Sequence, residues 1–237
     1  MFLIHSINQT VMKSKLLTLL SITLLFIFSG CEKDNYKAPD ATITGRVVYQ
    51  NLPLGVRSDG VQLELYQPGY AFSNKIPVYV KWDGTFSVKT FSGNYKLTRL
   101  KGNGPWADNT DTINVQLNGT ANVDVPVDPF FIIKNEAFTR NGTTVTATFN
   151  LQRINTSRAL ELVRLYIGKT IITDQARNEA NGTKNASAIT DLTQPVTVTA
   201  TIPAALANNE FVFVRVGVKA VNTAEYVYTM PLQLNLK

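Results

Sequence analysis

The sequence predicts an all-β protein made of two β-sandwich domains in tandem. Short runs rich in Val, Thr, Ile, Tyr and Phe alternate between apolar and polar side chains, and Gly, Asn, Asp or Pro separates them. Alternation with period two, broken by turns roughly every 8–12 residues, is typical of antiparallel sandwiches. Helical periodicity is nearly absent. Only "IPAALANN", residues 202–209, is expected to form a single helical turn, with Pro203 at its first position.

The first domain is predicted to span residues 38–128. Tight turns are expected at Asp83-Gly84 and Gly93-Asn94, because glycine accepts a positive φ. These turns should direct Phe86, Tyr95 and Leu97 toward the core. The alternating runs are, in order, "ATITGRVVYQ", "VQLELYQ", "VYVKW", "TFSVKTF", "YKLTRL", "TINVQL" and "ANVDVPV".

The second domain is predicted to span residues 129–237. The boundary falls in "VPVDPFF", where Pro126 and Pro129 suit a strand end and a stiff connection better than a central strand. The segment "QARNEANGTKNAS", residues 175–187, is predicted to be a long polar loop. The alternating runs are "TTVTATFNL", "LELVRLYIG", "VTVTATI", "FVFVRVGVKAV" and "YVYTMPLQL".

Residues 1–30 are interpreted as an over-extended start followed by an export signal at 12–30. Lys13 and Lys15 precede an apolar run, and Ser29-Gly30 leads directly to Cys31. The apolar run of about thirteen residues is shorter than the roughly 20 that a spanning helix needs. The pattern is similar to a bacterial lipobox, in which the signal is cleaved before a cysteine that is then acylated.

Cys31 is therefore predicted to be lipidated and to hold the protein on outer-membrane lipid, with residues 31–37 as a tether. A free thiol is the alternative, but it would leave an uncleaved apolar N-terminus in water. The following "EKDN" resembles the surface-export signal of Bacteroidota lipoproteins. The predicted location is the outer membrane facing the cell exterior, with its periplasmic face as the alternative.

The composition limits which catalytic sites, metal sites and disulfides are expected. The only histidine, His5, and the only cysteine, Cys31, lie in the predicted leader and at the acylation point. A Ser-His-Asp triad, a Cys-His pair, a histidine metal site and a disulfide are thus not expected, nor is any cofactor. Carboxylate-pair glycosidase chemistry and oxygen-ligated calcium stay open, but the acids lie in no distinctive motif. The protein is predicted not to be an enzyme.

Charge argues against nucleic acid as a partner. The net charge of +6 includes Lys13 and Lys15, so the chain from Cys31 onward carries about +4. Basic residues form no adjacent run of the kind that marks a nucleic-acid patch.

The order G-x-V, "DGTFS", G-x-Y-x-L within residues 41–128 resembles the carboxypeptidase-regulatory-like, or transthyretin-like, sandwich. The ending at residues 211–234 resembles an immunoglobulin or fibronectin-III sandwich. With the lipobox and "VDPFF", nearly the whole mature chain resembles Bacteroidota surface lipoproteins of the domain-of-unknown-function 3823 type. Members are often encoded beside starch-utilisation-type glycan import systems. The resemblance implies a glycan-binding accessory role, with polysaccharide and import proteins as partners.

Sugar binding would use aromatic rings that stack on pyranose faces and polar side chains that take the hydroxyls. The candidate ligand contacts lie in loops or beside turns: Trp106, Asp108 and Asn109 in "KGNGPWADNTD", Trp82 before the Asp83-Gly84 turn, and Tyr70 and Phe72 in "YQPGYAF". Trp106 could instead pack its own loop or a domain interface, and Trp82 could be a core or edge residue. Asp108, Asn109 and Asp111 form a solvated turn or, less favoured, a calcium cage.

The predicted function is that of a non-enzymatic, lipid-anchored surface protein that binds glycan for an import system. Two alternatives stay open. The chain could be a structural module that docks a partner protein, or a component of an adhesin or fimbria.

Overall fold

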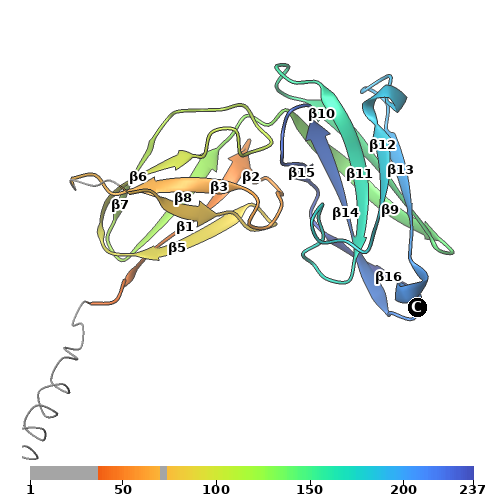
Figure 1. Ribbon diagram of the computed structural model, residues 1–237, viewed down its shortest axis with the longest axis horizontal. Helices are drawn as coiled ribbons and strands as arrows, with labels where there is room; N and C mark the ends of the chain where they lie inside the picture. The colour runs from red at the N-terminus through yellow and green to blue at the C-terminus, as the bar shows by residue number, and fades with distance from the viewer. Residues whose placement is uncertain (1–36, 70–73) are drawn as a thin grey trace, which may run out of the picture. The chain divides into compact units, whose positions relative to one another are not determined.

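The computed structural model describes residues 37–69 and 74–237 (Figure 1). Cys31, Tyr70 and Phe72 lie outside these residues, so their predicted roles stay predictions. Within the described ranges the elements are β-strands and two 3-10 turns, so the predicted all-β class is confirmed. The turn Ala204–Leu206 (η2) lies in the segment predicted to form one, but Pro203 is its N-cap and not its first helical residue as predicted. No helix in these ranges is both long and apolar enough to cross a membrane.

The first domain contains two sheets packed face to face. In one, β1 is central, with β2 and β5 antiparallel to it and β8 parallel to it; the other has the order β4-β3-β6-β7. The predicted core residues Phe86, Tyr95 and Leu97 are all buried. The strands are β1 (Ala41–Tyr49), β2 (Leu52–Pro53), β3 (Gln62–Tyr66), β4 (Ile76–Tyr79), β5 (Thr85–Thr90), β6 (Gly93–Arg99), β7 (Ile113–Leu117) and β8 (Thr120–Pro126).

The second domain also contains two sheets. One has the order β13-β10-β9; the other has the order β12-β11-β14-β15, with β16 also paired to β14. The strands are β9 (Phe131–Asn141), β10 (Thr144–Arg153), β11 (Leu160–Gly168), β12 (Ala180–Asn185), β13 (Val196–Thr201), β14 (Phe211–Ala220), β15 (Val227–Tyr228) and β16 (Leu232–Asn235).

The prediction of a continuous loop at residues 175–187 is wrong in its second half. Residues 180–185 form β12, an edge strand that pairs antiparallel with β11, and Ala186–Ala188 form a 3-10 turn. The strand is polar and contains Gly182, so its sequence has weak β-propensity. Pairing with the buried strand β11 overrides that preference. Gly182 fits because a Cβ there would lie 1.7 Å from the carbonyl oxygen of Thr199.

The two domains meet through charged and backbone contacts. Arg57 of the first domain makes a two-pronged ion pair with Glu225 of the second, whose side chain is buried. The fully buried Arg215 donates from Nη2 to the carbonyl oxygen of Trp82 at 2.7 Å. The amide of Tyr228 donates to the carbonyl oxygen of Gly55 at 2.9 Å. The two sandwiches therefore share a polar interface as well as their connection through residues 127–130.

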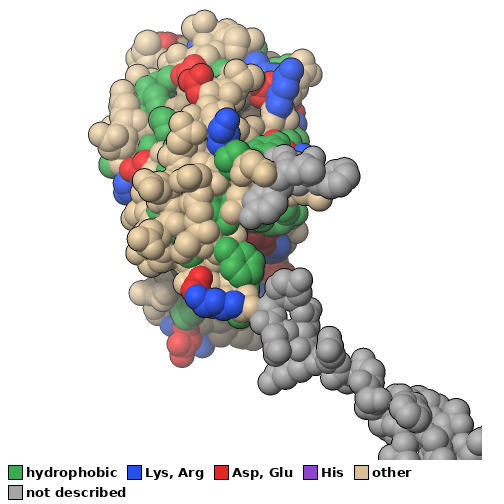
Figure 2. Space-filling view, turned by 90° about the vertical axis from the view of Figure 1, so that its left-hand side faces the viewer, with side chains coloured by type: hydrophobic (Ala, Val, Ile, Leu, Met, Phe, Trp, Pro, Cys, Tyr) green, Lys and Arg blue, Asp and Glu red, His purple; other side chains and the backbone are tan. Residues whose placement is uncertain are grey.

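Figure 2 shows one face of the molecule with basic and acidic side chains interspersed among polar and apolar ones. No large patch of one sign is visible on that face. The mixture agrees with the weak net charge of about +4 over residues 31–237 and offers no electrostatic footprint for nucleic acid on this side.

Candidate functional site

The predicted ligand contacts are not all in one place. Trp82 is half-buried where the two domains meet. Its carbonyl oxygen accepts hydrogen bonds from Arg215 Nη2 and from the amide of Val56. Trp82 thus has a structural role through its backbone. Asn109 is exposed and accepts the amide of Asp111 at Oδ1, 2.6 Å away, which is the geometry of a solvated Asx turn.

Trp106 is only 5% exposed and belongs to the hydrophobic core, so its ring faces are not open to a stacked sugar. Its backbone forms an isolated bridge with Pro129 in the interdomain connection. Gly104 lies directly against the indole, since a Cβ at Gly104 would be 2.1 Å from Cε2. This packing is the alternative that the sequence left open for Trp106.

Trp106 and Asp108 nonetheless share a small hollow, which we call the Trp106 pocket. It has a volume of about 130 Å³ and draws residues from both domains. Its polar side chains are those of Asp108, Ser157, Arg158, Asn222 and Thr223, and Phe130 lines it beside Trp106. The sequence placed Trp106 and Asp108 together, whereas the contribution of the second domain was not predicted.

Arg158 is held in a defined orientation in the Trp106 pocket. Its Nη1 donates to the carbonyl oxygens of Val221, at 3.1 Å, and Asn222. Its Cζ lies 5.3 Å from the centroid of the Phe130 ring, within cation–π range. Asn222 has φ of 59°, a left-handed conformation that Asn tolerates. An arginine fixed in this way keeps further N–H groups for a ligand, because a guanidinium has five N–H donors.

Asp108 is exposed and accepts the amide of Gly102 at Oδ1, 2.7 Å away, which leaves its second carboxylate oxygen for a ligand. In the described residues no group of three or more His, Cys, Asp or Glu side chains is placed to hold a metal ion. The Trp106 pocket therefore presents an indole edge, a carboxylate, a guanidinium and neutral polar groups around a space of sugar-ring size.

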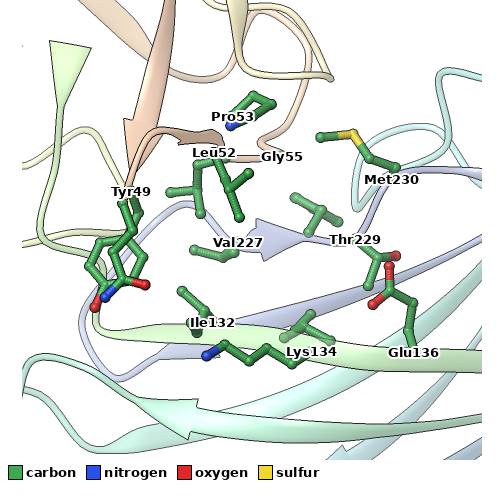
Figure 3. Close-up of a pocket in the computed structure, with 14 residues that line it drawn as sticks. Tyr49, Leu52, Pro53, Gly55, Ile132, Lys134, Glu136, Val227, Thr229 and Met230 are labelled. Atoms are coloured by element: carbon green, nitrogen blue, oxygen red, sulfur yellow. The ribbon is translucent and has the colours of Figure 1, made fainter. Parts of the chain in front are cut away.

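A second hollow, which the sequence did not predict, is shown in Figure 3. We call it the hairpin groove: it has a volume of about 200 Å³ between the β1–β2 hairpin of the first domain and strands β9 and β15 of the second. Most of its lining is apolar, and Lys134 and Glu136 border it from β9. Its lining residues are Tyr49, Gln50, Leu52–Gly55, Ile132–Lys134, Glu136 and Val227–Met230.

Two left-handed backbone segments shape the hairpin groove. Gln50 and Asn51 have φ of 50° and 65° and join the paired residues Tyr49 and Leu52, which defines a type I′ hairpin turn. The turn leaves Leu52 with 70% of its surface exposed.

The second segment is a bulge in β9. Asn135, with φ of 54°, and Glu136 together oppose Phe149 of β10. Bulges of this kind re-aim the side chains next to them.

A family model described as "Protein of unknown function (DUF3823) N-terminal domain" matches residues 41–128. A second, "Domain of unknown function (DUF3823_C)", matches residues 131–233. The two matches confirm the predicted presence of two tandem domains. No protein among the curated sequences matches the chain.

Solved structures agree with the family models. A DUF3823 family protein from Bacteroides ovatus is 36% identical, with a TM-score of 0.77 over 83% of this chain and 100% of that one. One from Parabacteroides merdae is 33% identical, with a TM-score of 0.78 over 84% and 100%. A Bacteroides uniformis protein described as a "putative carbohydrate binding protein" is 16% identical, with a TM-score of 0.68 over 84% and 100%, which is a likeness of fold.

Proposed function

This chain belongs to the DUF3823 family, and from that premise we propose that it is a non-enzymatic, lipid-anchored surface protein that binds glycan for an outer-membrane import system. The observation that carries the binding function is the Trp106 pocket, where the predicted Trp106 and Asp108 meet the ordered Arg158 of the second domain. A protein of the same fold described as carbohydrate binding is in keeping with this proposal.

The chemistry of the Trp106 pocket suits sugar hydroxyls. A hydroxyl both donates and accepts, so it can donate to Asp108 while accepting from Arg158. Trp106 Nε1 donates to no residue in the described part of the chain. It is not among the buried side-chain polar atoms there that lack a hydrogen-bond partner, which are Tyr166 Oη and Asp174 Oδ2, so it keeps contact with solvent. The indole therefore contributes its N–H edge rather than its face.

The size of the Trp106 pocket limits what enters it. Pockets for drug-sized ligands measure roughly 300–1,000 Å³. At about 130 Å³ this pocket accepts a single sugar ring, such as the end of a chain or one protruding branch. Binding of one ring through a few hydrogen bonds implies weak affinity, on the order of millimolar, which many copies on one cell surface would raise through multivalency.

Binding is tested by affinity electrophoresis of the purified protein through gels that contain a panel of polysaccharides. We expect at least one polysaccharide to retard the unmutated protein. Arg158→Ala should reduce the retardation at least tenfold, because it removes the charged donor, and Trp106→Phe should weaken it by removing Nε1 while keeping the ring. Arg164→Ala is the control, since Arg164 is half-buried like Arg158 but lies on β11 outside the pocket.

If Arg158→Ala and Trp106→Phe are retarded as strongly as the unmutated protein, the glycan binds outside the Trp106 pocket. If the unmutated protein passes every gel without retardation, the glycan proposal is wrong and a partner-docking role takes its place.

The lipid anchor rests on the signal and on Cys31. An acyl chain contributes about 0.8 kcal/mol per buried methylene, so two or more chains hold a protein on a membrane. In cells fed an alkyne-labelled fatty acid, the protein should carry the label and Cys31→Ala should lose it, while Lys37→Ala keeps it. Protease added to intact cells should digest the labelled protein if it faces outward. A labelled Cys31→Ala variant would refute the anchor, and protection from protease would place the protein on the periplasmic face.

A further inference from the structure

We propose that the hairpin groove is a second glycan contact and that it recognises an N-acetylated amino sugar through the acetamido group. The inference rests on the proposed glycan-binding function and adds to it both a site and a class of sugar. It is carried by the apolar lining of the groove together with one cationic and one anionic side chain on its border.

The apolar lining argues against a sugar that carries only hydroxyls. Leu52, Pro53, Ile132, Val227 and Met230 surround the space (Figure 3). Hydroxyl groups pressed against such side chains would lose their hydrogen bonds to water and gain none in return. A methyl group gains from the same contact. The acetamido group is a common sugar substituent that supplies such a methyl.

The charged border matches the rest of the acetamido group. An amide presents a carbonyl that accepts and an N–H that donates, and these point in opposite directions. Lys134 can only donate and Glu136 can only accept. In Figure 3 the ammonium end of Lys134 lies toward Tyr49 and the carboxylate of Glu136 lies toward Thr229, so donor and acceptor stand at opposite ends of the apolar space. Both side chains are exposed, so a ligand in the groove can reach them without a rearrangement of the backbone.

The backbone adopts left-handed conformations at the two points that shape the hairpin groove. The type I′ turn at Gln50-Asn51 holds Leu52 outward, and the bulge at Asn135 sets Lys134 and Glu136 beside the groove. Left-handed conformations of non-glycine residues carry a cost in stability and cluster at binding sites. Here the turn at Gln50-Asn51 and the bulge at Asn135 each position side chains that line the groove.

Leu52 and Met230, with 70% and 39% of their surfaces exposed, are the large apolar side chains most open to solvent in this groove. They stand on opposite domains, Leu52 on β2 and Met230 just after β15. A sugar ring between them would cover both with its C–H faces while the acetamido methyl enters the groove. Tyr49, half-buried at one end, would close that side of the ring.

The test is saturation-transfer NMR on the full mature protein with matched sugars. N-acetylglucosamine and N-acetylgalactosamine are compared with glucose and galactose, which differ at carbon 2 only. The acetyl methyl should receive the strongest saturation, and titrations should give at least tenfold tighter binding for the acetylated sugars. N-acetylglycine amide, which has the amide and methyl without the ring, should bind at least tenfold more weakly than the acetylated sugars.

Variants then locate the binding. Leu52→Ser and Glu136→Ala should each reduce the methyl signal at least fivefold, and both residues are exposed enough to be replaced without loss of folding. Matched controls are Leu232→Ser, a leucine on β16 with 44% of its surface exposed, and Glu210→Ala, an exposed carboxylate away from the groove. Both controls should bind as the unmutated protein does.

The outcomes separate this inference from the proposed function. Equal binding of acetylated and parent sugars, or binding that survives Leu52→Ser and Glu136→Ala, would overturn the groove inference and leave glycan binding intact. Acetamido binding that is lost in Arg158→Ala would assign it to the Trp106 pocket. Equal binding of N-acetylglycine amide would show that the groove recognises an amide and not a sugar. Absence of any sugar or polysaccharide binding would reject the proposed function as well.

Discussion

Replacing Arg215 by methionine is expected to lower the free energy of unfolding by about 3 kcal/mol. Arg215 is fully buried, and its Nε and Nη2 donate to the carbonyl oxygens of Thr229 and Trp82, both at 2.7 Å. Methionine fills a similar volume but donates nothing, so the carbonyl oxygen of Thr229 would lose the Arg215 donor and that of Trp82 would keep only the amide of Val56. The guanidinium also lies 4.4 Å from the ring centroid of Tyr228, a contact that methionine replaces only in part.

Burial is the main reason that the pKa of Arg215 falls to about 10, and the nearby Tyr228 and Asp174 oppose that fall. The guanidinium therefore stays charged at neutral pH, although no carboxylate forms an ion pair with it in the described residues. A buried cation whose hydrogen bonds all go to carbonyl oxygens depends on each of them. Since Trp82 belongs to the first domain, losing Arg215 also removes a hydrogen bond between the two domains.

The measurement is urea unfolding followed by tyrosine fluorescence and far-ultraviolet circular dichroism. Arg140→Met is the matched control, because Arg140 also donates to two carbonyl oxygens, of Gly142 and Asn235, but is exposed. Its replacement should cost about 0.5 kcal/mol or less. If Arg215→Met costs no more than Arg140→Met, the buried guanidinium does not stabilise the fold in the way the geometry implies.

The second large effect is expected from Gly45→Ala, which should destabilise the first domain by about 3 kcal/mol. Gly45 lies in β1, directly opposite Phe86 of β5 on one side and Val123 of β8 on the other. An added Cβ would lie 2.0 Å from the carbonyl oxygen of Val123 and 2.5 Å from Cζ of Phe86. A backbone carbonyl cannot move aside without breaking the ladder of β1 and β8.

Gly102→Ala is the control for this steric argument. Nothing lies within 4 Å of a Cβ at Gly102, although its φ of 68° disfavours alanine. Its replacement should therefore cost about 1–2 kcal/mol through backbone conformation alone. Thermal unfolding of both variants compares them. A melting temperature for Gly45→Ala at or above that of Gly102→Ala would contradict the close approach of β1 to its neighbours.

Local features of the fold could be predicted because neighbouring residues alone decide them. The Asp83-Gly84 turn forms as expected, with φ of 81° at Gly84 and Oδ1 of Asp83 accepting the amide of Thr85 at 3.0 Å. Phe86 then faces the core, because strand side chains alternate once the turn has set the register. Tyr95 and Leu97 are buried as predicted. The predicted Gly93-Asn94 turn is wrong, however, because both residues begin β6 and pair with Leu117 and Gln116 of β7.

Features that depend on distant parts of the chain could not be predicted in this way. Residues 180–185 look like a polar loop and become β12 because β11 offers them a free edge. Trp106 sits in a loop rich in Gly and Asn, yet Pro129 and Gly104 enclose it. Only the "QN" turn hinted at the hairpin groove, since Asn is favoured in type I′ turns. Nothing in the sequence indicated that β9 and β15 would face it.

The sequence by itself determined the all-β class, the presence of two tandem domains and the Asp83-Gly84 turn, because alternation and turn chemistry act over a few residues. It also determined which catalytic groups are scarce, since the chain contains a single histidine and a single cysteine. The tertiary structure alone decided which side chains meet. Trp106 joins Arg158 across the domains, and Leu52 faces Lys134 and Glu136 across the hairpin groove. The reason is physical: each hollow lies between residues of two domains, so only their packing brings its two sides together.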